Sequence, residues 1–135
     1  MSAASTVALT LVFLGLLLTG LSLNVSRLRL RYRVSFGDGG QPALLAAMRA
    51  HGKALEQTTL FGLLALAGAT LFPTDPLLLG VSCVAFSLAR VVHVMAVFSR
   101  RLRLRQAAHV ATVLTQLLLA GGVAREAVAV PGVLP

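Results

Sequence analysis

Four long apolar segments separated by short polar ones dominate the sequence. They cover about residues 4–25, 43–72, 77–98 and 107–128. Each is long enough, or nearly so, to cross a hydrocarbon core about 30 Å thick, which takes about 20 helical residues. The pattern therefore predicts an all-α protein, folded over residues 1–135 as one domain, an integral membrane four-helix bundle.

The composition supports a membrane protein. Hydrophobic residues make up 57% of the 135 residues, and the mean hydropathy is +0.88. A soluble domain of this size could not bury so much apolar surface. The opening "MSAAST" carries no basic residue and no cleavage-site pattern follows, so we expect the first segment to be a retained helix and not a signal peptide.

Cysteine and histidine usage points to no metal or redox chemistry. Cys83 is the single cysteine and lies in an apolar segment, where we expect it to pack in the core. The three histidines fall in three different predicted helices without the spacing of metal ligands. We therefore predict no metal site.

Basic residues, which give the chain a net charge of +8, are concentrated in two segments. These are "SRLRLRYR" (26–33), after the first helix, and "SRRLRLRQ" (99–106), after the third. The intervening turn, "FPTDP" (72–76), holds only Asp75. Lysine and arginine concentrate in cytoplasmic loops, so we predict that both basic loops are cytoplasmic and that both termini lie outside. This distribution indicates contact with anionic membrane lipids and not with nucleic acid.

Turn residues place the helix boundaries. "SFGDGGQP" (35–42) is a glycine-rich turn that ends in Pro42, which is tolerated at the start of a helix. In "FPTDP", Thr74 or Asp75 is a candidate N-cap for the third helix, with Pro76 at its first position. A second helix from Pro42 would be about 45 Å long, so its charged first half belongs at the cytoplasmic interface.

Polar side chains form stripes in the cytoplasmic halves of the helices. Arg49, Lys53 and Glu56 fall within about 60° of one another on the second helix, and His51 points roughly the other way. The third helix places Arg90 and His93 on one face. The fourth repeats polar residues at i, i+3 and i+7, namely His109, Thr112 and Gln116.

Glu56 and Arg90 lie at similar estimated depths. Counted from the outer turn, Glu56 is about 24 Å and Arg90 about 20 Å into the membrane. A lone charge there costs at least about 2.5–3.5 kcal/mol on insertion scales, so we predict that the two contact each other and orient the site. If they do not, Lys53 is the nearest alternative partner of Glu56. The surplus of cations over Glu56 predicts a site for an anionic ligand.

Two segments resemble the MAPEG family (membrane-associated proteins in eicosanoid and glutathione metabolism). "GDGGQPALLAAMRAHGKALEQT" is similar to its second-helix signature, close to Arg-x-His-x-Asn-x-x-Glu-x-x-Pro, through Arg49, His51 and Glu56. "ARVVHVMAVF" is similar to its third-helix segment through Arg90 and His93. Chain length, helix number and the two basic loops agree with this resemblance.

The resemblance implies a homotrimer in the bacterial inner membrane that uses glutathione as co-substrate. It implies a transferase or peroxidase acting on lipophilic electrophiles that arrive from the bilayer. A thiol-activating arginine near the start of the fourth helix matches Arg103 or Arg105, and we favour Arg105 as the catalytic residue. The candidate glutathione-binding residues are Arg27, Arg49, His51, Lys53, Glu56, Arg90 and His93.

Three positions depart from the family pattern. Lys53 stands where asparagine is usual, Thr59 where proline is, and Val97 where glutathione-using members often carry tyrosine. These departures keep open an alternative, a non-catalytic relative that binds a lipid or a partner protein. A small multidrug-type transporter is a third class, and it is disfavoured because the first helix has no acidic residue and the chain has one tyrosine.

Overall fold

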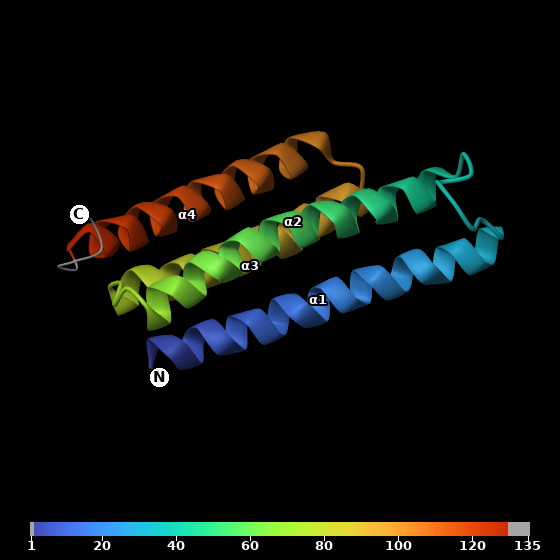
Figure 1. Cartoon of the computed structure of the whole chain (residues 1–135). Helices are drawn as coiled ribbons and strands as arrows, with labels where there is room; N and C mark the ends of the chain where they lie inside the picture. The colour runs from blue at the N-terminus through green and yellow to red at the C-terminus, as the bar shows by residue number, and fades with distance from the viewer. Residues whose placement is uncertain (1, 130–135) are drawn as a thin grey trace.

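A bundle of four antiparallel helices makes up the structure (Figure 1), a computed structural model that describes residues 2–129. The helices are α1 (Ala3–Tyr32), α2 (Pro42–Thr70), α3 (Pro76–Phe98) and α4 (Leu102–Ala129). No strand occurs among residues 2–129. The predicted all-α class and four-helix bundle are confirmed.

Three of the helices are long and apolar enough to cross a membrane, namely α1, α3 and α4. α2 is not among them, because the charged residues in its first half lower its mean hydropathy. However, α2 joins the end of α1 to the start of α3, and these lie at opposite ends of the bundle (Figure 1). Because its two neighbours cross the membrane, α2 traverses the same thickness.

Two helix boundaries differ from those predicted. The first helix continues through most of the basic segment 26–33, to Tyr32, and the fourth begins at Leu102, inside the basic segment 99–106. The expectation that these segments are loops was wrong over most of their length. Hydropathy locates the edge of the membrane, whereas leucine and arginine both favour helix and carry it beyond that edge.

Capping residues explain where the helices begin. Asp75 is the N-cap of α3, where its side chain accepts a hydrogen bond from the backbone N–H of Leu77 at 3.2 Å, and Pro76 follows at the first position. Pro42 likewise occupies the first position of α2, although the N-cap residue there, Gln41, makes no side-chain cap hydrogen bond. These boundaries were predicted, because proline at a first helical position removes an N–H that has no partner in the helix.

Arg29 has a structural task in the connection between α1 and α2. Its Nη1 donates hydrogen bonds to the carbonyl oxygens of Ser35 at 3.2 Å and Gly37 at 3.1 Å. Gly37 has φ of 65°, a left-handed conformation that glycine adopts at little cost. This arginine therefore fixes the loop, and only part of the basic segment is free to serve a ligand or a lipid.

The largest cluster of buried hydrophobic residues lies in the half of the bundle nearest the turn between α2 and α3. There Phe61 of α2 stacks on Phe86 of α3, with ring centroids 4.0 Å apart. Toward the other end, α2 presents alanines to its neighbours, including Ala47, Ala50 and Ala54. Such small side chains fill less of the space between the helices in this half.

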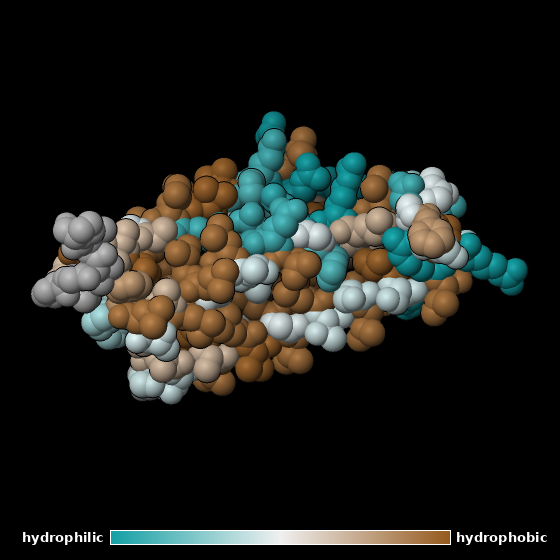
Figure 2. All heavy atoms as spheres, in the orientation of Figure 1, coloured by the Kyte–Doolittle hydropathy of each residue, from teal (hydrophilic) through white to brown (hydrophobic). Residues whose placement is uncertain are grey.

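The surface is largely apolar, as expected of a protein surrounded by lipid. Exposed leucines occur on every helix, among them Leu16, Leu63, Leu88 and Leu117, at 69, 64, 61 and 63% exposure. In Figure 2 this apolar surface is interrupted by hydrophilic side chains that gather near the middle of the bundle and at the end carrying the α1–α2 connection.

Candidate functional site

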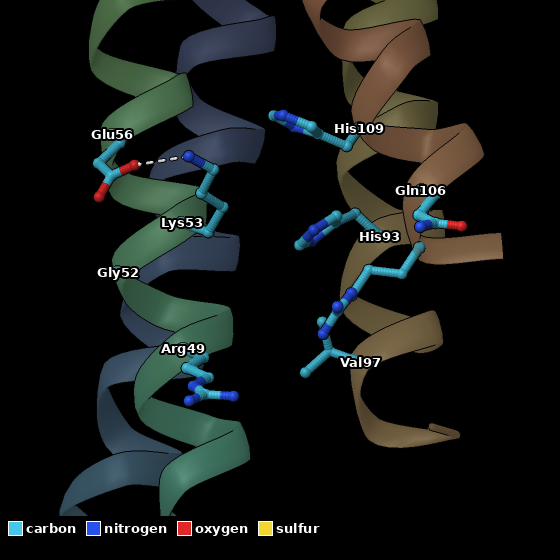
Figure 3. A pocket seen from close by; sticks show the side chains of 9 residues that line it. Arg49, Gly52, Lys53, Glu56, His93, Val97, Gln106 and His109 are labelled. Carbon is cyan, nitrogen blue, oxygen red and sulfur yellow. Dashed lines mark hydrogen bonds and ion pairs between the residues drawn. The ribbon is translucent and has the colours of Figure 1, made fainter. Parts of the chain in front are cut away.

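A cavity of about 470 Å³ lies between α2, α3 and α4, in the half of the bundle that carries the basic segments. Figure 3 shows α2 on one side of it and α3 with α4 on the other. Its walls combine cationic, imidazole and small side chains. The lining residues are Arg49, Gly52, Lys53, Glu56, His93, Val97, Arg105, Gln106 and His109.

One face of α2 supplies the charged wall. Arg49, Lys53 and Glu56 follow one another at spacings of four and three residues, so they share a face of the helix. Lys53 Nζ lies 3.0 Å from Glu56 Oε2, and the two side chains are 41 and 64% exposed. In Figure 3, the Lys53 side chain runs along α2 with its Nζ turned toward Glu56, whose carboxylate lies on the side of α2 away from α3 and α4. The single carboxylate of this cavity is therefore already paired.

The opposite wall carries two histidines. His93 of α3 is 5% exposed and His109 of α4 is half-buried, and both rings project toward α2 (Figure 3). The Nδ1 atom of each is buried and has no hydrogen-bond partner within residues 2–129. Buried polar atoms normally find a partner, so the lack of one for these two nitrogens among the described residues is unusual.

Arg90 lies in the interior of the bundle and not in the cavity wall. It is 1% exposed, and its Nη2 donates a hydrogen bond to the hydroxyl of Thr112 on α4. Its guanidinium lies 5.7 Å from the ring centroid of Phe86, within the range of a cation–π contact. Its Nε and Nη1 atoms have no partner in the described part of the chain.

The predicted contact between Glu56 and Arg90 was wrong. Glu56 pairs with Lys53, the alternative partner named above, and Arg90 bonds to Thr112. Residue counting estimates depth along a helix, and depth does not say which side of the helix a residue occupies. Glu56 lies about 200° around α2 from buried Thr58, so it faces away from the interior that holds Arg90.

Five of the predicted site residues meet at this cavity and three do not. Those that line it are Arg49, Lys53, Glu56, His93 and Arg105. Arg27 lines a different cavity between α1, α2 and α3, His51 is half-buried outside the cavity wall, and Arg90 is enclosed by the helices.

Sequence reasoning did not select four residues of the cavity, of which two are polar, Gln106 and His109; the other two are Gly52 and Val97. A signal for His109 existed, because it begins the polar i, i+3, i+7 stripe of α4. The two other members of that stripe are buried: Thr112 bonds to Arg90, and Gln116 donates to the backbone oxygen of Gln57 at 3.0 Å. The stripe therefore faces the interior of the bundle.

Comparison with known proteins decides the family. The MAPEG family model matches residues 7–125, which is most of the chain and includes every residue of the cavity. The chain belongs to the MAPEG family. This MAPEG protein is a multi-pass integral membrane protein, as its composition and helices indicate.

Two curated relatives of this MAPEG protein are similar over a shorter stretch. Both are Inner membrane protein YecN, from Escherichia coli strain K12 and from Escherichia coli O6:H1 strain CFT073. Each is 51% identical over 49 residues, which is 36% of this chain and 37% of the relative. The chain thus matches little more than a third of the length of these relatives.

Proposed function

We propose that the cavity between α2, α3 and α4 binds glutathione and that the protein is a glutathione-dependent transferase or peroxidase of the inner membrane. One observation carries the proposal. Three cations, Arg49, Lys53 and Arg105, surround a cavity whose carboxylate, Glu56, is already paired with Lys53. An anionic ligand would neutralise the remaining positive charge.

Glutathione has the charges that such a cavity selects. It carries two carboxylates at its ends and a thiol in its middle, so it needs cationic groups that are spread apart. Arginine holds a carboxylate with two parallel hydrogen bonds in a partly dry site. Arg49 on α2 and Arg105 on α4 stand on different helices, and the imidazole rings of His93 and His109 line the same cavity.

Arg105 is the candidate for activating the thiol. A nearby guanidinium lowers the pKa of a thiol, which then loses its proton to water and becomes the reactive thiolate. The thiolate sulfur forms a bond to an electrophilic carbon while the leaving group departs with the bonding electrons. With a hydroperoxide, the sulfur takes the terminal oxygen and releases an alcohol, and a second glutathione then yields the disulfide and water. Preorganised charge and proximity supply the catalysis.

The lipophilic substrate arrives from the bilayer, and the active form is a homotrimer with glutathione bound near the contact between subunits. This assembly follows from the family resemblance. Lys53 of α2 supports it, since hydrocarbon does not solvate its ammonium group and a neighbouring subunit or ligand would. Crosslinking in native membranes tests the assembly: bands at three times the monomer mass are expected, and monomers alone would contradict it.

Calorimetric titration of glutathione into the detergent-solubilised protein tests the ligand. We expect binding heat from the natural protein and its loss in Arg49→Ala, because Arg49 lines the cavity. Arg31→Ala is the matched control, since it removes an exposed arginine of α1 that lies outside the cavity. Equal loss in both variants, or no heat at millimolar glutathione, would contradict glutathione as the ligand.

A second candidate function is binding without catalysis, and Val97 favours it. This side chain lines the cavity at the position where glutathione-using members often carry a tyrosine hydroxyl. A valine offers no hydrogen bond to a thiolate. Turnover of a general electrophile such as 1-chloro-2,4-dinitrobenzene separates the catalytic function from the binding function. If a preparation binds glutathione stoichiometrically and shows no turnover, the result favours a lipid- or partner-binding role.

A further inference from the structure

A second cavity of about 330 Å³ lies where the start of α2 meets the turn between α3 and α4. Four arginines line it, Arg49, Arg100, Arg101 and Arg105, and no acidic residue does. The remaining wall is apolar and includes Leu45 and Leu102 among its side chains. A cationic rim over an apolar wall matches an amphiphile with an anionic head.

The four guanidinium groups are not neutralised by any described residue. The ion pairs found within residues 2–129 are Lys53 with Glu56 and Arg125 with Glu126, and none of the four arginines takes part in them. The same four side chains donate no hydrogen bond to another described residue. Four adjacent cations repel one another, so a site of this kind favours a counter-ion with more than one negative oxygen.

The depth of the cavity coincides with lipid headgroups. Measured along the helices from the turn between α2 and α3, Arg49 lies about 34 Å and Arg100 about 36 Å away, at 1.5 Å per residue. The hydrocarbon core is about 30 Å thick, and the headgroup layer begins beyond it. When the turn between α2 and α3 lies at one edge of the hydrocarbon core, these arginines reach the lipid phosphates at the opposite edge.

The backbone of the α3–α4 turn holds two of the arginines at this cavity. Arg100 has φ of 53°, a left-handed conformation that is uncommon for a residue other than glycine. The backbone N–H of Arg101 donates to the carbonyl oxygen of Ala96 at 3.0 Å, which closes the end of α3. Glycine is the usual residue at such a helix end, and an arginine there adds a guanidinium to the cavity rim.

We propose that this cavity binds the phosphate group of an anionic phospholipid from the adjacent leaflet. Basic pockets between membrane helices at this level are suited to such headgroups. The apolar wall accommodates the start of the acyl chains, which free phosphate lacks. Arg49 and Arg105 line both cavities, whereas Arg100 and Arg101 line only this one, so variants at Arg100 and Arg101 test the lipid site separately from the glutathione cavity.

Native mass spectrometry of the detergent-solubilised protein tests the proposal. Phosphatidylglycerol and phosphatidylethanolamine with the same acyl chains are titrated separately, and the dissociation constant of the first bound lipid is measured. We expect phosphatidylglycerol to bind more tightly. Arg100→Gln with Arg101→Gln should weaken its binding about tenfold, because each arginine near the membrane surface contributes measurably to anionic-lipid affinity.

The matched control is Arg31→Gln with Arg33→Gln, which removes the same charge from exposed positions outside this cavity. We expect it to change phosphatidylglycerol binding less than about twofold, with helicity and thermal midpoint unchanged in both double variants. Equal weakening in the two double variants would overturn the site, because it would indicate unspecific attraction. Displacement of the lipid by inorganic phosphate at millimolar concentration would overturn the assignment to phospholipid in favour of free phosphate.

Discussion

Arg90 of α3 donates a hydrogen bond to the hydroxyl of Thr112 of α4, and both side chains are buried, at 1 and 0% exposure. The hydroxyl in turn donates to the backbone oxygen of Ala108 at 2.8 Å. One threonine therefore links a guanidinium of one helix to the backbone of the next. Among the described residues, the guanidinium of Arg90 interacts with the Thr112 hydroxyl and with the Phe86 ring, and its other nitrogens have no hydrogen-bond partner.

Replacing Thr112 by valine should destabilise the protein by about 1–3 kcal/mol, because the isosteric methyl leaves a buried charged donor without its partner. Thermal unfolding in detergent measures the effect. Thr112→Ser should retain most of the stability, since it keeps the hydroxyl.

Thr59→Val is the control for that substitution. Thr59 is exposed, and its hydroxyl donates a hydrogen bond to the backbone oxygen of Leu55, in the same helix, at 2.9 Å. The change should shift stability by less than about 0.5 kcal/mol, as is usual for surface substitutions. If Thr112→Val is no more harmful than Thr59→Val, the link between α3 and α4 contributes little.

Glu56→Gln should cost little, about 0.2–0.5 kcal/mol, because an exposed pair with Lys53 at i, i+3 is weakly stabilising. Arg90→Glu should be far more harmful, since it buries a carboxylate beside Thr112. The double exchange of Glu56→Arg with Arg90→Glu should therefore give no rescue of the thermal midpoint. A clear rescue would instead support direct contact between Glu56 and Arg90.

The order and extent of the helices could be predicted because hydrophobic runs and turn residues are local signals. Pro42 and Pro76 marked two helix starts correctly. The end of α1 at Tyr32 and the start of α4 at Leu102 were each missed by several residues. Arginine lowers the mean hydropathy of a segment and is nevertheless a good helix former.

The cavity could be predicted only in part, because it depends on how helices are rotated against one another. Arg49, Lys53 and Glu56 were grouped correctly, since they lie on one helix and follow its period. The partner of Glu56 depended on the facing sides of two helices. Residue counting gives a depth along each axis and gives no rotation about it, so Arg90 was paired with the wrong side chain.

Gly68 should tolerate substitution poorly. A Cβ atom there would meet Thr74 Oγ1 at 3.0 Å and Val123 Cγ2 at 3.1 Å, tighter than usual contacts. We expect Gly68→Val to destabilise by about 1–3 kcal/mol through overpacking between α2 and α4. Gly20→Val is the control, because nothing lies within 4 Å of its Cβ position. Thermal midpoints that fall equally in both variants would contradict close packing at Gly68.

The orientation in the membrane follows from where the arginines lie, and cysteine labelling in intact cells tests it. We predict that both basic segments face the cytoplasm, because the turn of residues 72–76 carries no basic residue. A membrane-impermeant maleimide should label Pro73→Cys in intact cells, and Ser35→Cys and Ser99→Cys only after lysis; all three positions are exposed. Native Cys83 is 1% exposed and gives little background. Labelling of the two serine replacements in intact cells, with Pro73→Cys protected, would reverse the topology and place the arginine cavity in the outer leaflet.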